Sequence, residues 1–214
     1  IVDSTANITY STLSWSANII DNGGSMTLWN NTPSLTIPSG ATYTANTQRS
    51  YADGTVNGTI TTTANSNAET YKVNLSFTGN VTISSTGVID TAGKGYAATY
   101  GTGAGTLGAG GSYGGGGGNT SSPTYGSIIN PVNIGSGGAG AAGGGAVILN
   151  ITGSGKTFTN NGIIKADGSN NSGAGAGGSI NISIPNGTWA GNGSITANGG
   201  SSGNGGGGGR IAVT

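Results

Sequence analysis

The sequence predicts an all-β fold, a parallel β-helix or β-solenoid with stacked glycine-rich tracts and essentially no α-helix. Three observations lead to this fold class. Short β-branched segments recur at 146–152, 179–184 and 210–214, each directly after a glycine run. Val147, Ile180 and Ile211 within them lie 33 and 31 residues apart, so the spacing is nearly constant. No segment has the 3.6-residue hydrophobic period of an amphipathic helix. A unit of this size cannot bury its apolar face alone and must stack on its neighbours.

Each repeat contains a second short strand and an aromatic residue. The second strands are predicted at 162–168 and 193–199, and a related half-unit at 87–93 has the same glycine-bounded outline. Successive units should place equivalent strands side by side in parallel. We therefore expect one buried ladder of Val147, Ile180 and Ile211, a second of Ile164 and Ile195, and an aromatic stack of Phe158 and Trp189.

The 47 glycines need a physical explanation, because each ordered glycine loses more backbone entropy than any other residue. A bundle of polyproline-II-like segments, in which backbones approach closely and hydrogen-bond to one another as in collagen, requires the absence of side chains. The tracts at 101–118, 135–145, 173–178 and 199–209 are predicted to form such a polyglycine-II-like bundle. The alternative is that they are flexible surface loops.

The chain divides by composition into two regions. Residues 1–85 contain less glycine, and alternating patterns predict strands at 7–16, 25–29, 34–37, 55–62, 70–77 and 80–83. This region is either the opening coils or cap of the same solenoid, which we favour, or a small β-sandwich in front of it. Residues 86–214 are predicted to be the glycine-rich solenoid. A long insertion at 94–145 interrupts it, with Pro123 and Pro131 marking a surface excursion.

Charge and composition exclude several partners. Only 6% of the residues are charged, the formal net charge is zero, and Cys and His are absent. No disulfide, thiolate metal site or cofactor is therefore expected, and neither nucleic acid nor insertion into a membrane is predicted. The chain begins at Ile1 rather than Met, which favours removal of a signal segment and an extracellular or cell-surface location. A fragment of a longer protein is the alternative.

The acidic residues argue against catalysis. Parallel β-helices that cleave polysaccharides need paired carboxylates or a calcium cluster. Asp90 and Asp167 fall near equivalent places in their units but are offset, and Asp90 with Lys165 is interpreted as a solvated pair between coils. We predict that the protein is not an enzyme. The acids are Asp3, Asp21, Asp53, Glu69, Asp90 and Asp167.

Two sets of residues are candidates for contact with sugars. Aromatic rings offer a flat apolar surface with a polar edge, to which a sugar ring can bind. The candidates for glycan contact are Trp15, Trp29, Tyr43 and Tyr113. The alternative is that these rings fill the core or cap the coil. Many Asn-x-Ser/Thr sequons occur, as expected in part by chance in this composition. The candidates for N-glycosylation are Asn7, Asn57, Asn119 and Asn186.

The Ile/Val strands, the glycine-bounded turns and the run Gly206-Gly-Gly-Gly-Arg-Ile-Ala-Val213 resemble glycine-rich parallel β-helix segments of large secreted or cell-surface proteins of bacteria and archaea. A weaker resemblance is to phage tail-tip adhesins, whose glycine-rich motifs form polyglycine-II sandwiches. Both resemblances imply an extracellular structural or adhesive role. Neither transfers a functional residue.

Three classes of function follow. The first is a subunit of an extracellular filament or surface layer that polymerises head to tail with copies of itself through strand pairing. The second is an adhesin for a glycan or another surface. One variant is ice binding through a flat threonine array, which the three threonines at 61–63 support only weakly. The third and remote class is a polysaccharide-active enzyme. The strand residues predicted to mediate assembly are Ile1, Val2, Ile8, Ile211 and Val213.

Overall fold

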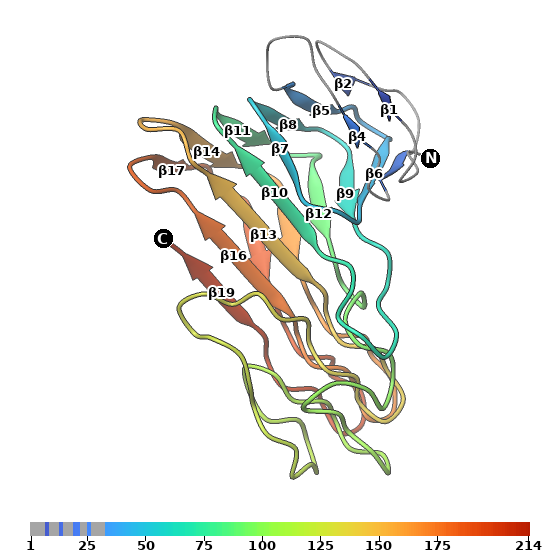
Figure 1. Ribbon diagram of the computed structural model, residues 1–214. Coiled ribbons are helices and arrows are strands. Elements are labelled where there is room, and N and C mark those ends of the chain that lie inside the picture. The colour runs from blue at the N-terminus through green and yellow to red at the C-terminus, as the bar shows by residue number, and fades with distance from the viewer. Residues whose placement is uncertain (1–6, 9–12, 15–18, 22–24, 27–32) are drawn as a thin grey trace.

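The protein is a stack of β-coils, and Figure 1 shows the strands of successive coils side by side from β7 (Arg49–Tyr51) to β19 (Arg210–Val213). The structure is a computed structural model that describes the backbone of residues 7–8, 13–14, 19–21 and 25–26 and the whole of residues 33–214. No helix occurs within these described residues. All pairings between their strands are parallel, which confirms the predicted all-β parallel β-helix.

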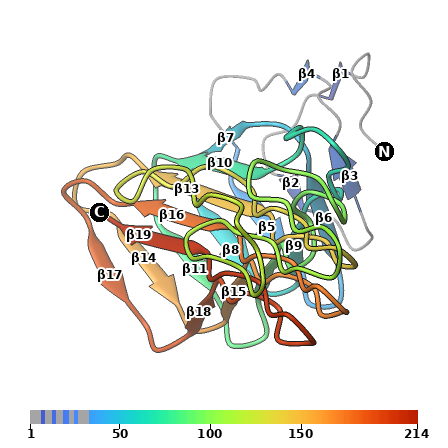
Figure 2. The same ribbon diagram turned by 90° about the horizontal axis from the view of Figure 1, so that it is seen from below.

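Three parallel sheets form the walls of the solenoid (Figure 2). The first contains β7 (Arg49–Tyr51), β10 (Val73–Phe77), β13 (Ala146–Ile151), β16 (Ser179–Ser183) and β19 (Arg210–Val213). The second contains β2 (Leu13–Ser14), β5 (Leu35–Ile37), β8 (Gly54–Val56), β11 (Val81–Ile83), β14 (Thr157–Asn160) and β17 (Thr188–Ala190). The third contains β3 (Ile19–Asp21), β6 (Thr42–Ala45), β9 (Thr59–Thr61), β12 (Val88–Asp90), β15 (Ile163–Lys165) and β18 (Ser194–Thr196). A separate pair joins β1 (Asn7–Ile8) to β4 (Ser25–Met26).

The predicted ladders are present in register. Val147 pairs with Ile180 and Ile180 with Ile211, while Ile164 pairs with Ile195. Phe158 pairs with Trp189, and their ring centroids lie 4.8 Å apart. These columns point inward, because the apolar side chains of successive coils are buried on the same face of each strand. The core is therefore a set of continuous columns that run along the solenoid axis.

Each complete coil has three strands rather than the two expected from the sequence. The aromatic segments around Phe158 and Trp189 are themselves strands, β14 and β17, and they form the second sheet. In the same way, the single strand predicted at 55–62 is two strands, β8 and β9, separated by a turn at Asn57 and Gly58. Three-residue strands carry too short a pattern for alternation to reveal each corner of the coil.

Strands from the first 85 residues extend the same sheets. β5 and β8 continue the column of β11, and β6 and β9 continue that of β12. The segment that joins the third sheet to the first is short in one of these coils, residues 46–48 between β6 and β7, and longer in the next, residues 62–72 between β9 and β10. In the later coils this joining segment is the glycine-rich tract.

The glycine-rich tracts are packed against each other beneath the sheets. Along residues 174–178 the hydrogen-bond acceptor changes with a period of three. The amides of Ala174 and Gly177 donate to the 204–207 segment, those of Gly175 and Gly178 to the 166–169 segment, and that of Ala176 to Ser136. Three residues per turn with bonds to different neighbours is the arrangement expected of polyproline-II-like segments. The tracts are thus ordered parts of the solenoid and not separate loops.

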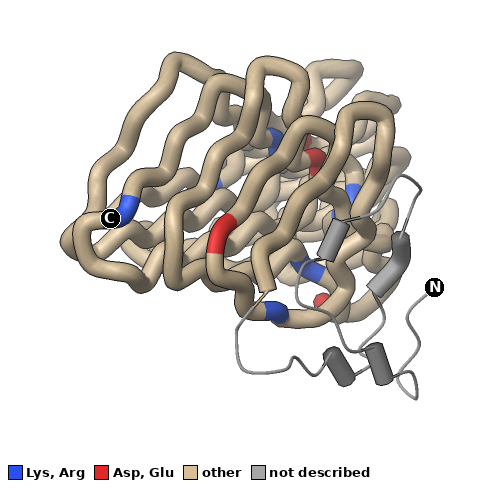
Figure 3. The backbone as a smooth tube through the Cα atoms, turned by 90° about the horizontal axis from the view of Figure 1, so that it is seen from above, with Lys and Arg blue, Asp and Glu red and all other residues tan. Residues whose placement is uncertain are grey.

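Charged residues are few and lie scattered along the tube (Figure 3). Lys165 Nζ lies 3.0 Å from Asp90 Oδ2, so this pair bridges neighbouring coils as the sequence indicated. Both side chains are about one-third exposed. An exposed pair of this kind contributes under about 1 kcal/mol, and backbone pairing and core packing hold the coils together.

Candidate functional site

The core columns are open at the end of the solenoid where β17, β18 and β19 lie. Ile180 and Ile182 are fully buried in β16, yet Ile211 and Val213, which pair with them, are 46% and 49% exposed. Trp189 is 37% exposed on the outer side of the buried Phe158. These residues face inward along the coil, but no further coil covers them in the described part of the chain. We call this apolar cross-section, made by Trp189, Ile195, Ile211 and Val213, the open end.

The backbone at the open end also lacks partners on one side. Within the described residues, β17, β18 and β19 each pair with a single strand, which is β14, β15 and β16 respectively. Such an edge is a template for another strand unless charge or proline blunts it. Arg210 is the charged residue of β19, and its guanidinium donates to the carbonyl oxygen of Tyr125 at 3.0 and 3.2 Å. The Arg210 side chain therefore points toward the insertion 94–145.

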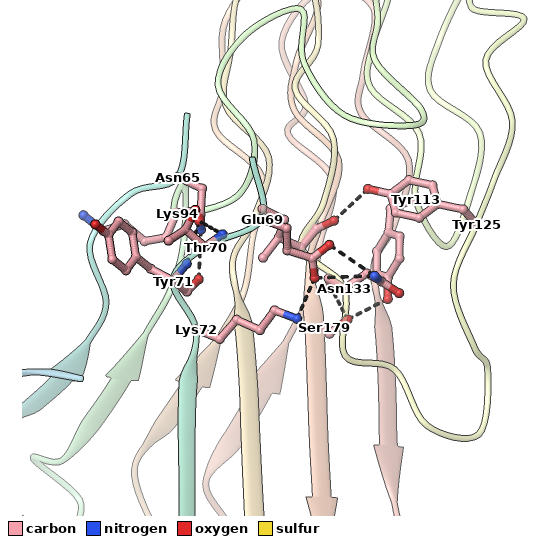
Figure 4. Close-up of polar contacts among 11 residues, drawn as sticks. Asn65, Glu69, Thr70, Tyr71, Lys72, Lys94, Tyr113, Tyr125, Asn133 and Ser179 are labelled. Atoms are coloured by element: carbon pink, nitrogen blue, oxygen red, sulfur yellow. Dashed lines mark hydrogen bonds and ion pairs between the residues drawn. The ribbon is translucent and has the colours of Figure 1, made fainter. Parts of the chain in front are cut away.

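The insertion 94–145 is fastened to the start of β16 by buried polar contacts (Figure 4). Tyr113 is fully buried, and its Oη lies 2.6 Å from Ser179 Oγ. The same Ser179 hydroxyl donates to the carbonyl oxygen of Asn133 at 2.5 Å. The Arg210 guanidinium lies 5.6 Å from the centre of the Tyr113 ring. These contacts hold the insertion in one place beside the open end.

A second group of contacts ties the insertion to the segment before β10. Glu69 forms an ion pair with Lys72 at 2.7 Å, and Asn133 Nδ2 donates to the Glu69 carboxylate at 3.2 Å. Asn65 Oδ1 in turn accepts the amides of Thr70 and Tyr71. Figure 4 shows Glu69 lying between Lys72 and Asn133. Asn65 Nδ2 also donates to the carbonyl oxygens of Tyr71 and Lys94, so these contacts form a connected network, which is the arrangement of a structural clamp.

Burial raises the pKa of the Tyr113 and Tyr125 phenols above the ordinary tyrosine value. Hydrogen bonds to Ser179 and Ser136 oppose this shift without cancelling it. Both phenols are accordingly neutral hydrogen-bonding groups near neutral pH. In the described residues, no three His, Cys, Asp or Glu side chains gather where they could hold a metal ion.

The insertion exposes large apolar side chains at its turns. Leu107 is fully exposed and has a φ of 51°, a left-handed backbone that leucine rarely adopts. Ile128 and Ile129 are 74% and 81% exposed, and Tyr100 is 47% exposed. The sequence analysis identified the insertion as a surface excursion but did not predict Leu107, Ile128 or Ile129 as exposed apolar residues. The sequence signal that could have identified Ile128 and Ile129 is the pair of adjacent isoleucines between Gly126 and Pro131.

The structure corrects part of the proposed glycan surface. Tyr43 and Tyr113 are 1% and 0% exposed, so neither ring offers a face to a sugar. Tyr43 fills the core and its Oη lies 3.1 Å from that of Tyr51. Trp15 and Trp29 lie outside the described residues, as do Ile1 and Val2. Of the other assembly residues, Ile8 lies in β1 paired with Met26, and Ile211 and Val213 lie at the open end.

The candidate sequons differ in accessibility. Asn119 and Asn186 are exposed at turns with φ values of 53° and 59°. Asn57 is partly buried in the turn between β8 and β9, and Asn7 lies in β1. Of the three candidate asparagines whose side chains the structure describes, Asn119 and Asn186 are the exposed ones. No helix of the described residues has the length and apolar character needed to cross a bilayer.

Comparison of the chain with protein family models, curated proteins and solved structures gives no match. The open end and the insertion are therefore the two features of the molecule that indicate a function.

Proposed function

We propose that the protein is an extracellular structural protein whose copies assemble end to end into a filament or surface layer. The observation that supports this proposal is the half-exposed apolar cross-section of the last described coil, which a further coil, of the same chain or of another copy, would bury. Burying such side chains contributes about 25 cal/mol per Å² of apolar surface, so an uncovered core face favours association. The uncharged and glycine-rich composition supports an extracellular location.

The shape of the two ends favours a second copy of the same chain as the partner. At the open end the glycine bundle extends past the last coil, because the insertion packs outside the 205–209 tract. The amides of Gly115 and Gly118 donate to the carbonyl oxygens of Gly208 and Gly205. The coils at the other end lack a glycine tract between β6 and β7. In the proposed contact, the overhanging bundle of one copy lies beneath the segment between β6 and β7 of the next.

The contact joins two different surfaces, so it is heterologous. Repetition of a heterologous contact gives an open filament unless the rotation closes a ring. Parallel pairing of β17 and β18 with β2 and β3 of the next copy would continue the second and third sheets. The near-zero net charge removes repulsion between identical subunits.

The test is assembly of the 214-residue chain, followed by sedimentation and electron microscopy as a function of concentration. Ile211→Lys places a charge in the open end and should abolish long assemblies. Ile129→Lys is the matched control, because it places the same charge on an exposed isoleucine of the insertion and should leave assembly unchanged. Monomers at all concentrations, or equal loss in both variants, would contradict the proposal.

A second candidate function is adhesion through the insertion. It is favoured by Leu107, Ile128 and Ile129, which are exposed on a segment held rigidly by the Tyr113 and Glu69 contacts. Exposed apolar groups on an ordered loop are typical of binding surfaces. In this case Ile129→Lys, and not Ile211→Lys, should reduce retention of the protein on cell-wall or glycan surfaces.

A further inference from the structure

The second sheet carries an unbroken column of threonines on its outer face. Thr36, Thr55, Thr82 and Thr159 are paired residue by residue through β5, β8, β11 and β14. Each lies between two buried residues of its strand and is itself only partly buried, so it points outward. The register continues to Ser14 in β2 and Ala190 in β17. The four come from segments that are widely separated in sequence, and only the coil brings them together.

The column is a regular array, because neighbouring strands in a sheet lie about 4.8 Å apart. Threonine is β-branched and has few χ1 rotamers, so equivalent side chains repeat the same orientation. Each contributes one hydroxyl and one methyl group. The result is a straight row of alternating polar and apolar groups about 14 Å long.

The hydroxyls of this column are available to a ligand. Among the described residues, none of these four hydroxyls has a hydrogen-bond partner in the protein. Two outward threonines of the third sheet differ in this respect. Thr61 Oγ1 donates to the carbonyl oxygen of Asp90 at 2.6 Å, and Thr196 Oγ1 donates to Asp167 Oδ2 at 2.9 Å.

The neighbouring positions keep the face weakly charged. The strands β5, β8, β11, β14 and β17 of this sheet contain no charged residue, while Asp53 directly precedes β8 and Lys156 directly precedes β14. Asp53 Oδ1 accepts the amide of Asn80 at 2.8 Å. The third sheet by contrast has the Asp90–Lys165 pair on its outer face. The outer face of the first sheet is partly covered, since Asn181 Nδ2 donates to Asn130 of the insertion at 2.6 Å.

We propose that this threonine column binds ice. Rows of oxygen atoms on the basal and primary prism planes of hexagonal ice repeat at nearly the spacing of the strands. Pre-ordered hydroxyls lose little entropy on binding, and many weak contacts to one lattice add up. A crystalline polysaccharide is disfavoured, because sugars are recognised through aromatic faces and no described outward residue of this sheet is aromatic.

The experiment measures partition of the purified protein into slowly growing ice, together with inhibition of ice recrystallisation. The unmodified chain should be enriched in the ice fraction. Thr82→Tyr places a bulky ring in the middle of the column and should raise the concentration needed for inhibition about tenfold or more. Ser76→Tyr is the control, since Ser76 in β10 points outward in the same coil but on the first sheet. It should behave as the unmodified chain.

Exclusion of the unmodified protein from ice would overturn the proposal without any variant. Equal effects of the two tyrosine substitutions would do so as well, provided that circular dichroism shows both variants folded. Retention on crystalline cellulose or chitin that Thr82→Tyr abolishes, with no enrichment in ice, would assign the column to a polysaccharide. Thr159→Tyr replaces Thr82→Tyr if the latter is unfolded.

Discussion

At the scale of single residues, glycines differ sharply in what they contribute. A Cβ added to Gly206 would overlap the carbonyl oxygen of Gly175, which belongs to the neighbouring tract. A Cβ added to Gly208, two residues along the same tract, would meet nothing within 4 Å. The obstructing atom at Gly206 is backbone held by its own hydrogen bonds and cannot turn aside as a flexible side chain can. Glycine is required at the first position and only tolerated at the second.

Gly206→Ala should therefore lower the free energy of unfolding by about 1–3 kcal/mol, as over-packing usually does. For a chain of this length, each kcal/mol corresponds to about 2–4 °C in the midpoint of thermal unfolding. Gly208→Ala should leave the midpoint unchanged or raise it slightly, because alanine restricts the unfolded chain. Differential scanning calorimetry of both variants checks this. Equal midpoints would show that the tracts are not packed as described.

The buried phenols make stability depend on alkaline pH. Burial raises the pKa of Tyr125 and Tyr113 in the folded protein, whereas in the unfolded chain tyrosine ionises near pH 10. Above about pH 10 the unfolded state loses protons that the folded state retains, so the free energy of unfolding falls as pH rises. Tyr125→Phe should flatten this fall in urea titrations between neutral and strongly alkaline pH. The exposed Tyr100→Phe is the control, and an unchanged slope in Tyr125→Phe would refute the assignment.

At the scale of strands, the position of a coil in the stack decides what the same residue type contributes. Ile180 and Ile211 belong to one ladder and pair directly, but Ile180 has a coil on both sides and Ile211 on one. Their exposures of 0% and 46% follow from this difference. A residue of such a ladder makes its full hydrophobic contribution to the free energy of unfolding only when a further coil covers it.

Ile180→Ala should lower the free energy of unfolding of the monomer by about 3 kcal/mol, since it leaves a cavity between two coils. Ile211→Ala should cost about 1 kcal/mol, because much of its surface is already in water. Chemical denaturation at a concentration below assembly measures both. At higher concentration the effect of Ile211→Ala should grow if the open end becomes buried. A cost at Ile211 equal to that at Ile180 in the monomer would mean that another surface covers β19.

At the scale of the whole molecule, the sheets and the glycine bundle form one continuous stack. The tract 173–178 contacts the segments before and after it in the coil order and also the insertion, through the bond from Gly111 to the carbonyl oxygen of Ala174. The insertion is thereby part of the bundle and contributes to its outer layer. Long non-local contacts of this kind make folding depend on many segments at once.

Hydrogen exchange should report this arrangement directly. The amides of residues 174–178 all donate to backbone carbonyl oxygens of other segments, so they should exchange as slowly as those of β13 and β16. The exposed turn at residues 202–203 should exchange rapidly. Exchange followed by mass spectrometry resolves these peptides. Rapid exchange throughout 174–178 would show that the glycine tracts open independently of the sheets.

The sequence by itself determined the parallel β-coil, because the ladder residues recur at near-constant spacing and lie between glycine runs that stop each strand. It also supported the interpretation of Asp90 and Lys165 as a pair between coils, which their 3.0 Å contact confirms. Both are local or periodic properties, and a single chain displays them directly.

Only the tertiary structure decided the rest. The burial of Tyr43 and Tyr113, the threonine column and the open end depend on register between coils of unequal length, separated in one case by the whole insertion. A sequence period cannot fix register across such interruptions. The stacking order of the coils decides in which direction each side chain points and which surface remains uncovered. That order is determined by the packed backbone of the complete solenoid.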